Sequence, residues 1–441
     1  MRTRDFILGA ALLAGCGAPE PVSLNDLHGR DLRFAPPSRT KEAAREILRK
    51  DELTLEDALA VADALNPRLA AEAGNVDLAA AEAWEARLYP NPTLLLQVED
   101  YRPRDGATTG RSERKAGAAV PLVFSGRLGK AARLADAERE AAALQYLWRR
   151  REILAETKGA FIACLATRRS ATLARETRDI ARAVRDVSEE RFRAQAVPEM
   201  EVLKASVALD RAEIDLRDAE KEAEVARGTL ASLMGDARAP RDRISGQLAE
   251  RFRDPGLEAL RERLLAGHPL LESAARTREA AEAELALARA GRLPEPQLEV
   301  LAGRDSEDEA ILEGGLSIPL PLFNRNQGRI AAAGARIRRA ERQEEAARND
   351  LLRQLAGTYA DFSSAQDRAA AYREGILPRA EKALAQTREG YRLGKFTLLD
   401  LLDSQRTLAE ARSASGAAIR DLNRAAAELE KLTGTGMEPI R

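Results

Sequence analysis

Cysteine, histidine and aromatic residues are scarce in this chain of 441 residues, which has only 2 Cys, 2 His and 2 Trp. This scarcity argues against a disulfide framework and against a clustered thiol or imidazole site for a metal ion. The net charge of -1 leaves no basic surplus of the kind that binds nucleic acid. A phosphate loop, a zinc-site spacing and a nucleophile elbow are also missing. We therefore expect no enzymatic activity, no cofactor, no bound metal and no nucleic-acid partner.

A long hydrophobic run is the other missing feature, because no stretch approaches the roughly 18 consecutive apolar residues of a membrane-spanning helix. Instead, Ala, Leu, Glu and Arg fill most of the sequence and 32% of the residues are charged, which is typical of long packed helices. Proline ends or interrupts helices, so its positions divide the chain. They predict helices over Leu55–Leu65, Arg68–Leu88, Ser125–Ala196, Glu199–Leu233, Asn326–Leu393 and Thr397–Leu432, with a kink at Pro378.

The N-terminus has the pattern of a secretory signal. Two arginines precede the apolar run Phe6–Ala14, which ends in Leu13-Ala-Gly-Cys16 and is too short to span a bilayer as a helix. This ending resembles the bacterial lipobox, which implies a signal peptide over residues 1–15, cleavage before Cys16 and acylation of Cys16. By the same resemblance, Gly17 in place of an aspartate favours the outer membrane. The alternative is an ordinary signal peptide followed by a chance cysteine.

Two stretches of the chain, residues 53–235 and 257–434, repeat one another. Val120-Pro-Leu122 matches Ile318-Pro-Leu320, and Leu230-Ala-Ser-Leu-Met-Gly235 matches Leu429-Glu-Lys-Leu-Thr-Gly434. From Phe124 and Phe323 onward the offset between the two copies is constant. We therefore predict a tandem duplication. The remaining residues form an extended N-terminal segment over 16–52, a linker over 236–256 and a tail over 435–441.

Each repeat also contains two short segments that alternate as β-strands do. In Thr93–Glu99, apolar residues occupy one face and polar residues the other, and the small-residue segment Ala116–Phe124 follows a polar loop. The second repeat has the same pattern in Leu298–Ala302 and Leu312–Ile318. Four such strands are too few for a closed barrel, because known membrane barrels begin at about eight strands. Several chains must therefore pool their strands.

Together these features resemble the TolC-type outer-membrane efflux proteins over nearly all of Leu53–Gly434. The resemblance rests on the duplication, the two Pro-x-Pro strand entries, Ser317-Ile-Pro-Leu-Pro-Leu-Phe-Asn-Arg-Asn-Gln-Gly328 and Gly390-Tyr-Arg-Leu-Gly-Lys-Phe-Thr-Leu-Leu-Asp-Leu-Leu-Asp403. It implies a mainly α fold with a small β part, in which the duplicated long helices form an α-barrel. It also implies a homotrimer whose chains each contribute four strands to a twelve-stranded transmembrane β-barrel.

The resemblance further implies a passive exit duct of a tripartite efflux system, lipid-anchored in the cell outer membrane and extending into the periplasm. Its partners would be a periplasmic adaptor, also called a membrane fusion protein, an inner-membrane pump of the RND type and outer-membrane lipid. The segment Ser317–Gly328 looks most like the subgroup that serves heavy-metal cation exporters. Two alternatives stay open: a drug or protein export duct of the same fold, and a non-channel periplasmic coiled-coil lipoprotein that acts as a scaffold.

Candidate site residues lie near the two predicted hairpin tips. Asp400 and Asp403 share a helix face, and the family's matching aspartates line the closed periplasmic end, where rings of carboxylates select cations. Glu201 occupies the position equivalent to Asp400 in the first repeat and is predicted to join this gate. The alternative is that the acids cap the return helix, since acidic groups stabilise a helix N-terminus. The predicted adaptor contacts are Phe192, Arg193, Tyr391, Gly394 and Lys395.

Phe396 departs from the family, whose members often have an arginine near this position that pairs with acids of the neighbouring helix pair. Either Lys395 or Arg392 substitutes for it, or the closed state depends on packing. Gly394 is expected to adopt a left-handed turn. His268, before a proline at a helix junction, and Cys164, in an apolar helical stretch, are interpreted as structural residues.

Overall fold

The computed structural model describes residues 40–99, 112–236, 244–307 and 309–440. Within them the chain is mainly helical, with one four-stranded sheet. The elements in chain order are α2 (Lys41–Ile47), α3 (Leu55–Leu65), α4 (Pro67–Glu85), β1 (Thr93–Glu99), β2 (Glu113–Pro121), α5 (Arg127–Arg193), α6 (Glu199–Leu233), α7 (Leu257–Gly267), α8 (Pro269–Ala290), β3 (Gln297–Arg304), β4 (Ala310–Ser317), α9 (Gln327–Ala371), η2 (Tyr372–Ile376), α10 (Leu377–Arg392) and α11 (Leu398–Thr433).

The chain forms two compact units, and each unit draws on both sequence repeats. Apart from the undescribed residues, the first, here called the strand unit, contains Gly74–Leu144 and Glu272–Ala346. The second, here called the hairpin unit, contains Ser23–Ala73, Gln145–Leu271 and Ala347–Arg441, with the same exception. The compact units therefore do not coincide with the sequence repeats, because α5 and α9 each contribute residues to both units.

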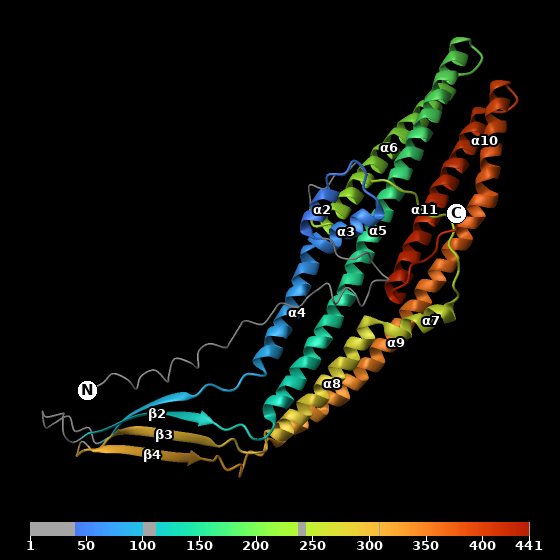
Figure 1. The fold of residues 1–441 in the computed structure, drawn as a ribbon. Coiled ribbons are helices and arrows are strands. Elements are labelled where there is room, and N and C mark those ends of the chain that lie inside the picture. Colours follow the sequence, from blue (N-terminus) through green and yellow to red (C-terminus); the bar gives the residue numbers. More distant parts are fainter. Residues whose placement is uncertain (1–39, 100–111, 237–243, 308, 441) are drawn as a thin grey trace. The chain divides into compact units, whose positions relative to one another are not determined.

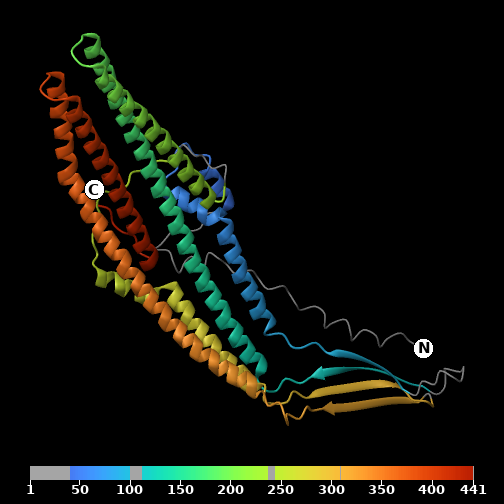
Figure 2. The same cartoon turned by 180° about the vertical axis from the view of Figure 1, so that it is seen from behind.

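The strand unit contains the sheet, in which the strands follow in the order β1-β2-β3-β4, each antiparallel to the next (Figures 1 and 2). Leu96 lies opposite Ala116, Ala116 opposite Ala302, and Ala302 opposite Leu312. The sequence predicted β1 with its observed bounds, whereas β2 begins before Ala116, at Glu113. The earlier start follows because Glu113 pairs with Glu99 in the ladder.

Two helix pairs complete the strand unit. An ion pair between Arg87 and Asp136, 2.7 Å from nitrogen to oxygen, joins the end of α4 to the start of α5. An ion pair between Arg278 and Glu344, at 3.1 Å, joins α8 to α9. Because exposed ion pairs contribute only about 0–1 kcal/mol each, they align these helices more than they stabilise them.

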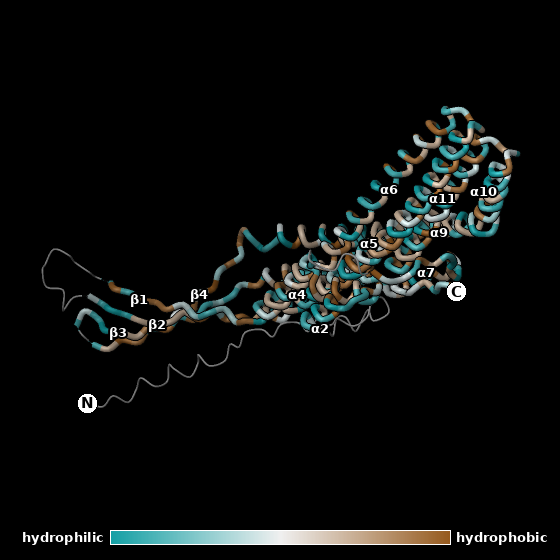
Figure 3. The backbone as a smooth tube through the Cα atoms, turned by 90° about the horizontal axis from the view of Figure 1, so that it is seen from above, coloured by the Kyte–Doolittle hydropathy of each residue, from teal (hydrophilic) through white to brown (hydrophobic). Residues whose placement is uncertain are grey.

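The hairpin unit contains two helical hairpins, α5 with α6 and α10 with α11 (Figure 1). The bounds of α6 are those that the sequence predicted. Gly434 ends α11 with a φ of 69°, and Gly235 follows α6 with a φ of 76°. Glycine suits both ends because it adopts the left-handed conformation without a steric cost. Figure 3 shows hydrophobic and hydrophilic residues mixed along these helices.

None of the described helices combines the length and the apolar character that crossing a membrane requires.

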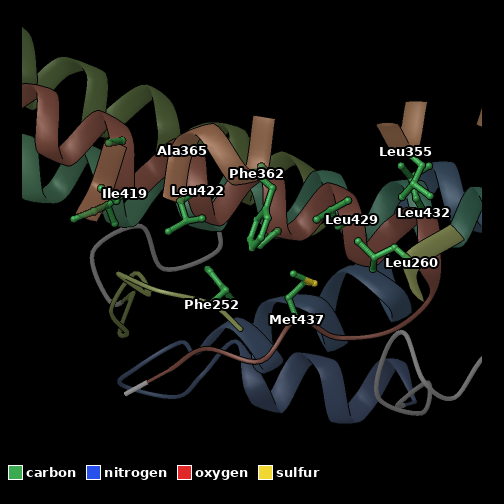
Figure 4. Close-up of a cluster of buried hydrophobic side chains, with 14 of the residues drawn as sticks. Phe252, Leu260, Leu355, Phe362, Ala365, Ile419, Leu422, Leu429, Leu432 and Met437 are labelled. Carbon is green, nitrogen blue, oxygen red and sulfur yellow. The ribbon is translucent and has the colours of Figure 1, made fainter. Parts of the chain in front are cut away.

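A cluster of buried side chains in the hairpin unit joins α7, α9 and α11 to the linker and the C-terminal tail (Figure 4). Phe362, Leu422 and Leu429 are fully buried at its centre. Phe252 of the linker packs edge to face on Phe362, with ring centroids 6.3 Å apart, and Met437 belongs to the same cluster. Burial of one such side chain contributes roughly 1.5–3 kcal/mol. The linker at Phe252 and the tail at Met437 are therefore part of the core.

Residues 41–47 correct the prediction of an extended segment over 16–52. They form α2, where the Thr40 hydroxyl accepts a hydrogen bond from the Ala43 N–H, and Ala44 and Ile47 are buried against Leu53. The prediction was wrong here because the prolines that suggested an extended chain all precede Thr40. The predicted signal peptide, the predicted acylation site Cys16 and residues 17–39 lie outside the described residues.

The long helix predicted over Asn326–Leu393 is divided ahead of Pro378. α9 ends at Ala371, the π-turn η2 follows, and α10 begins at Leu377 with the proline in its first turn. Inside a helix, the proline ring clashes with the carbonyl four residues earlier, which here belongs to Glu374 in the π-turn. The interruption predicted at Pro378 therefore takes the form of a π-turn just before the proline, and π-turns are one known cause of helix kinks.

Candidate functional site: the sheet faces and the hairpin tips

One face of the sheet is apolar and exposed. Residues that lie opposite one another in antiparallel strands share a face, so the register gathers alternate residues of all four strands. This apolar face carries Leu94, Leu96, Val98, Val120, Leu298, Val300, Leu312 and Leu316, whose exposed fractions are 42% to 77%. Soluble monomers rarely leave so large an apolar patch in contact with water. The face is therefore suited to apolar surroundings.

The opposite face of the sheet is mainly polar, although Leu95, Leu301 and Ile311 also lie on it. The register places Gln97, Glu99, Glu113, Lys115, Glu299, Glu313 and Ser317 on it. Carboxylates outnumber the single lysine in this group, so the face is anionic. An anionic lining favours the passage of cations over anions.

Lys115 forms ion pairs with carboxylates of three strands on the polar face. Its side chain is 6% exposed, and its Nζ lies 2.8 Å from a carboxylate oxygen of Glu113, 2.8 Å from one of Glu313 and 3.5 Å from one of Glu99. Lys115 lies opposite Gly303 of β3. Because Gly303 has no side chain, the path of the lysine across β3 to Glu313 on β4 is open. No sequence pattern predicted this contact, which spans three strands.

Both helical hairpins turn through the same backbone geometry. Gly394 has a φ of 72°, as predicted, and Gln195, its equivalent in the first repeat, has a φ of 57°. In the second repeat the Lys395 N–H donates to the Gly390 carbonyl at 2.8 Å, and in the first repeat the Ala196 N–H donates to the Arg191 carbonyl at 2.8 Å. Gln195 was not singled out from the sequence, although the constant offset between the repeats points to it.

Tyr391 joins the two hairpins. Its side chain is 3% exposed. Its hydroxyl lies 3.4 Å from Oε2 of Glu201 in α6 and 3.4 Å from Oγ of Ser188 in α5. The Arg191 guanidinium lies 4.7 Å from the centre of its ring. A side chain buried in this way offers no surface to an adaptor, so Tyr391 is corrected from an adaptor contact to a contact within the chain.

Asp400 caps α11. Its carboxylate accepts hydrogen bonds from the Thr397 hydroxyl at 2.7 Å and the Thr397 N–H at 2.9 Å. These bonds, the hydroxyl first, hold the pKa of Asp400 below its ordinary value. Pro198 takes the place of Thr397 in the first repeat and has neither a hydroxyl nor an N–H. Glu201 therefore cannot form the equivalent capping hydrogen bonds, and its carboxylate contacts Tyr391 instead. The capping role considered for Asp400 is therefore present, and its side chain remains exposed.

Asp403 faces a groove of about 860 Å³ between α6 and α11. Met200, Leu203 and Val207 form much of the opposite wall. The carboxylate lies 2.7 Å from Arg406 of the same helix and is 59% exposed. Since such an exposed pair contributes about 0–1 kcal/mol, it leaves the Asp403 carboxylate accessible to ions in the solvent.

The other predicted tip residues lie at the surface. Phe192 is 42% exposed. Arg193 and Lys395 are exposed as well, and Arg193 lies 3.5 Å from Glu189 of its own helix.

Phe396, at the position of the missing arginine, and Arg392, one of the two cations considered in its place, both make contacts within their own helix or turn. Phe396 packs on its own turn, since a Cβ added to Gly390 would lie 2.1 Å from Phe396 Cδ2. Arg392 lies 2.8 Å from Glu389 of its own helix. The second tip is therefore stabilised by packing at Phe396, while Arg392 is engaged within α10.

His268 is a helix cap. Its Nδ1 accepts a hydrogen bond from the Leu270 N–H at 3.2 Å, and its ring lies 4.7 Å from the Trp148 ring. Burial and the nearby Arg151 lower the pKa of His268 to about 3. Asn66 has the same role in the first repeat, where its Oδ1 accepts the Arg68 N–H at 2.9 Å.

Cys164 is buried among apolar side chains of α3, α5 and α6, as predicted. Burial raises the pKa of its thiol to about 11, so it is protonated near neutral pH. Within the described part of the chain, no group of three or more His, Cys, Asp or Glu side chains is placed to hold a metal ion.

Two segments of the chain, residues 58–236 and 260–435, match the family model described as outer membrane efflux protein. The chain belongs to the outer membrane efflux protein family. The members of this family are efflux channels, which are not enzymes.

The efflux protein is similar to the cobalt-zinc-cadmium resistance protein CzcC of Cupriavidus metallidurans, with 29% identity over 385 residues. The alignment covers 87% of this chain and 90% of CzcC. Protein CyaE of Bordetella pertussis is 28% identical, with coverage of 83% and 82%. The solved structure of CusC, described in connection with transmembrane channel formation, superposes with a TM-score of 0.76 at 18% identity and covers 87% of this chain and 92% of CusC. The fold is therefore that of the TolC-type outer-membrane channels.

Proposed function

We propose that three copies of this efflux protein form the outer-membrane exit duct of a tripartite efflux system. The observation that carries the proposal is the two-faced sheet, which is apolar on one face and anionic on the other. Within the described chain, β1 and β4 are edge strands. Strand edges must be paired in lipid, and closed barrels need about eight strands or more. Three chains would close the sheet with the apolar face toward lipid and the anionic face toward water.

The helical hairpins would provide the periplasmic part of this duct. A periplasmic adaptor would bind the exposed tips at Phe192, Arg193, Gly394 and Lys395, and an inner-membrane pump of the RND type would act through the adaptor. Acylation at Cys16 would anchor each chain in the outer membrane. The tandem duplication would explain why the two hairpins turn with the same backbone geometry.

The tip contacts support a gate at the periplasmic end. In a trimer, Asp400 and Asp403 would form two rings of three carboxylates, which repel one another when they are brought close. Closure therefore needs attractive contacts elsewhere. The contact of Tyr391 with Glu201 and Ser188 supplies one between the two hairpins of each chain.

We further propose heavy-metal cations as the cargo. CzcC is named for cobalt, zinc and cadmium resistance, and the anionic sheet face and the acidic tip residues would favour cations. The metal would be transported without a resident site. Family membership and fold now disfavour the scaffold alternative, which leaves the apolar sheet face without a role.

The first test is the mass of the particle that detergent extracts from purified outer membranes of cells expressing the full chain. Three chains per particle are expected. A monomer, a dimer, or absence from that membrane would overturn the channel proposal. In planar bilayers, Asp403→Ala should reduce the preference of the trimer for cations, and the control Asp403→Glu should keep it.

A second test addresses the cargo. The channel would be expressed with its adaptor and pump in cells that lack their own cation exporter. A gain in tolerance to cobalt, zinc or cadmium, without a gain toward dyes and antibiotics, supports a cation duct. A gain confined to dyes and antibiotics would assign the alternative of a drug duct.

A further inference from the structure

The segment that connects β4 to α9 presents large apolar side chains to the solvent. Ile318 is 47% exposed, Leu320 72%, Leu322 64% and Phe323 92%. This segment is part of the motif that carried the family resemblance, and neither the gate nor the adaptor contacts use it. Side chains as large as these are seldom left in water as a group.

Hydrogen bonds hold the segment in this conformation. The Gln327 side-chain amide donates to the Phe323 carbonyl at 3.1 Å, and the Asn326 side-chain amide donates to the Ala288 carbonyl of α8 at 2.6 Å. Asn326 has a φ of 62°. A Cβ at Gly291 would lie 2.8 Å from Asn326 Nδ2, so the absence of a side chain there leaves room for the contact. The exposure of Phe323 therefore results from an ordered turn.

The segment continues the apolar face of the sheet at the end where the strands join the helices (Figure 1). Leu316, the last apolar-face residue of β4, is 60% exposed and lies just before it. At the same end of the sheet, Phe124 follows β2 at the position equivalent to Phe323 and is 76% exposed. Aromatic side chains are enriched where an apolar membrane-facing surface meets the headgroup region.

Two arginines follow these apolar residues. Arg325 and Arg329 are both exposed, and neither forms an ion pair with an acid among the described residues. Cations at the start of a helix do not favour its formation, so α9 gains no stability from them. They are placed to contact anions outside the chain, next to the exposed Phe323.

We propose that Leu320, Leu322, Phe323, Phe124, Arg325 and Arg329 form a binding surface for anionic phospholipid at the inner-leaflet boundary of the outer membrane. The leucines and phenylalanines contact the acyl chains near the glycerol. The two guanidinium groups bind the phosphate of the headgroup, as arginine does with fixed geometry. This inference rests on the proposed function, because it requires the apolar sheet face to lie in the membrane.

The test uses trimeric particles of the full chain, reconstituted in vesicles of phosphatidylcholine with a minor share of phosphatidylglycerol. The particles are then re-extracted, and the lipids that remain bound are counted by mass spectrometry. The wild type should retain phosphatidylglycerol in excess of its share. The double variant Arg325→Gln/Arg329→Gln should lose this excess, by about fivefold for each arginine. The control Arg338→Gln/Arg348→Gln removes the same charge from exposed positions further along α9 and should keep the excess.

A second variant, Phe323→Ser, separates the lipid surface from a contact between chains. Lipid binding predicts fewer retained lipids of both kinds and an unchanged trimer. Loss of the trimer with unchanged lipid composition would overturn the proposal and make the segment a subunit contact. An equal loss of phosphatidylglycerol in the control double variant would also overturn it. Failure of the channel proposal is separate, because it would appear as the absence of a trimer in the wild type.

Discussion

A lysine on the apolar face of the sheet should prevent channel assembly, whereas the same substitution one residue earlier should not. Leu96 lies at the middle of β1, is 73% exposed and belongs to the apolar face. Leu95 belongs to the polar face, where it lies opposite Gly117. Because Gly117 has no side chain, a lysine at 95 has room to reach solvent. Leu96→Lys and Leu95→Lys therefore differ in the face that carries the charge.

The expected magnitude follows from the position of Leu96 in the strand. A lysine facing lipid near the midplane of a barrel costs about 2–4 kcal/mol. Three chains carry the substitution, so the cost is about 6–12 kcal/mol for each trimer. At about 1.4 kcal/mol for each factor of ten, even the lower value reduces the assembly constant by about four orders of magnitude. Leu95→Lys places its ammonium on the anionic face and should cost less than about 1 kcal/mol.

The assay measures the fraction of trimer in detergent extracts of outer membranes, by electrophoresis without heating. Leu95→Lys should match the wild type, and Leu96→Lys should be absent from the trimer band. Equal trimer fractions in the two variants would refute the assignment of the faces. A trimer for Leu96→Lys but not for Leu95→Lys would show that the sheet is turned the other way.

Three further predictions concern the hairpin unit. Gln195→Gly should raise the free energy of unfolding by roughly 1 kcal/mol, and Gly394→Ala should lower it by a similar amount, because a side chain disfavours positive φ. Thermal unfolding in detergent measures both changes. His268 has a pKa of about 3 in the folded state, against an ordinary value of 6.5. Between these pH values the folded state binds fewer protons than the unfolded state, so the free energy of unfolding decreases as the pH is lowered. The wild type should therefore lose about 2 kcal/mol from pH 7 to pH 5, and His268→Asn, which keeps a cap, should not; denaturant midpoints at the two pH values decide this. Tyr391→Phe removes the hydroxyl that faces Glu201 and should raise conductance in bilayers at unchanged trimer content, whereas unchanged conductance would exclude this contact from gating.

Features that depend on neighbouring residues were predicted well. Alternation defined β1, Pro198 placed the start of α6 at Glu199, and Gly394 has the expected positive φ. The steric rules for proline and glycine act within a few residues, so they do not require the fold. The helix α2 is the exception. A helix of seven residues is unstable by itself and forms because Ala44 and Ile47 are buried in a core.

Contacts between distant residues were decided by the tertiary structure. The sequence marked Glu201 as the counterpart of Asp400, but only the folded hairpins bring it to the Tyr391 hydroxyl, 190 residues away. Likewise, no local pattern predicts that Asp63 and Arg150 form a fully buried ion pair with a nitrogen–oxygen distance of 2.7 Å. Such pairs depend on how whole elements pack, because burying either charge without its partner is strongly destabilising.

The sequence by itself thus determined most of the long helices, the duplication and the alternation of the strands, because periodicity and the sterics of proline and glycine act locally. The tertiary structure decided that the two β-hairpins share one sheet, that Lys115 reaches Glu313, and that Phe323 is held exposed on an ordered turn. The reason is physical: register and burial are properties of elements in contact, and the energy that selects them comes from packing between segments far apart in the chain.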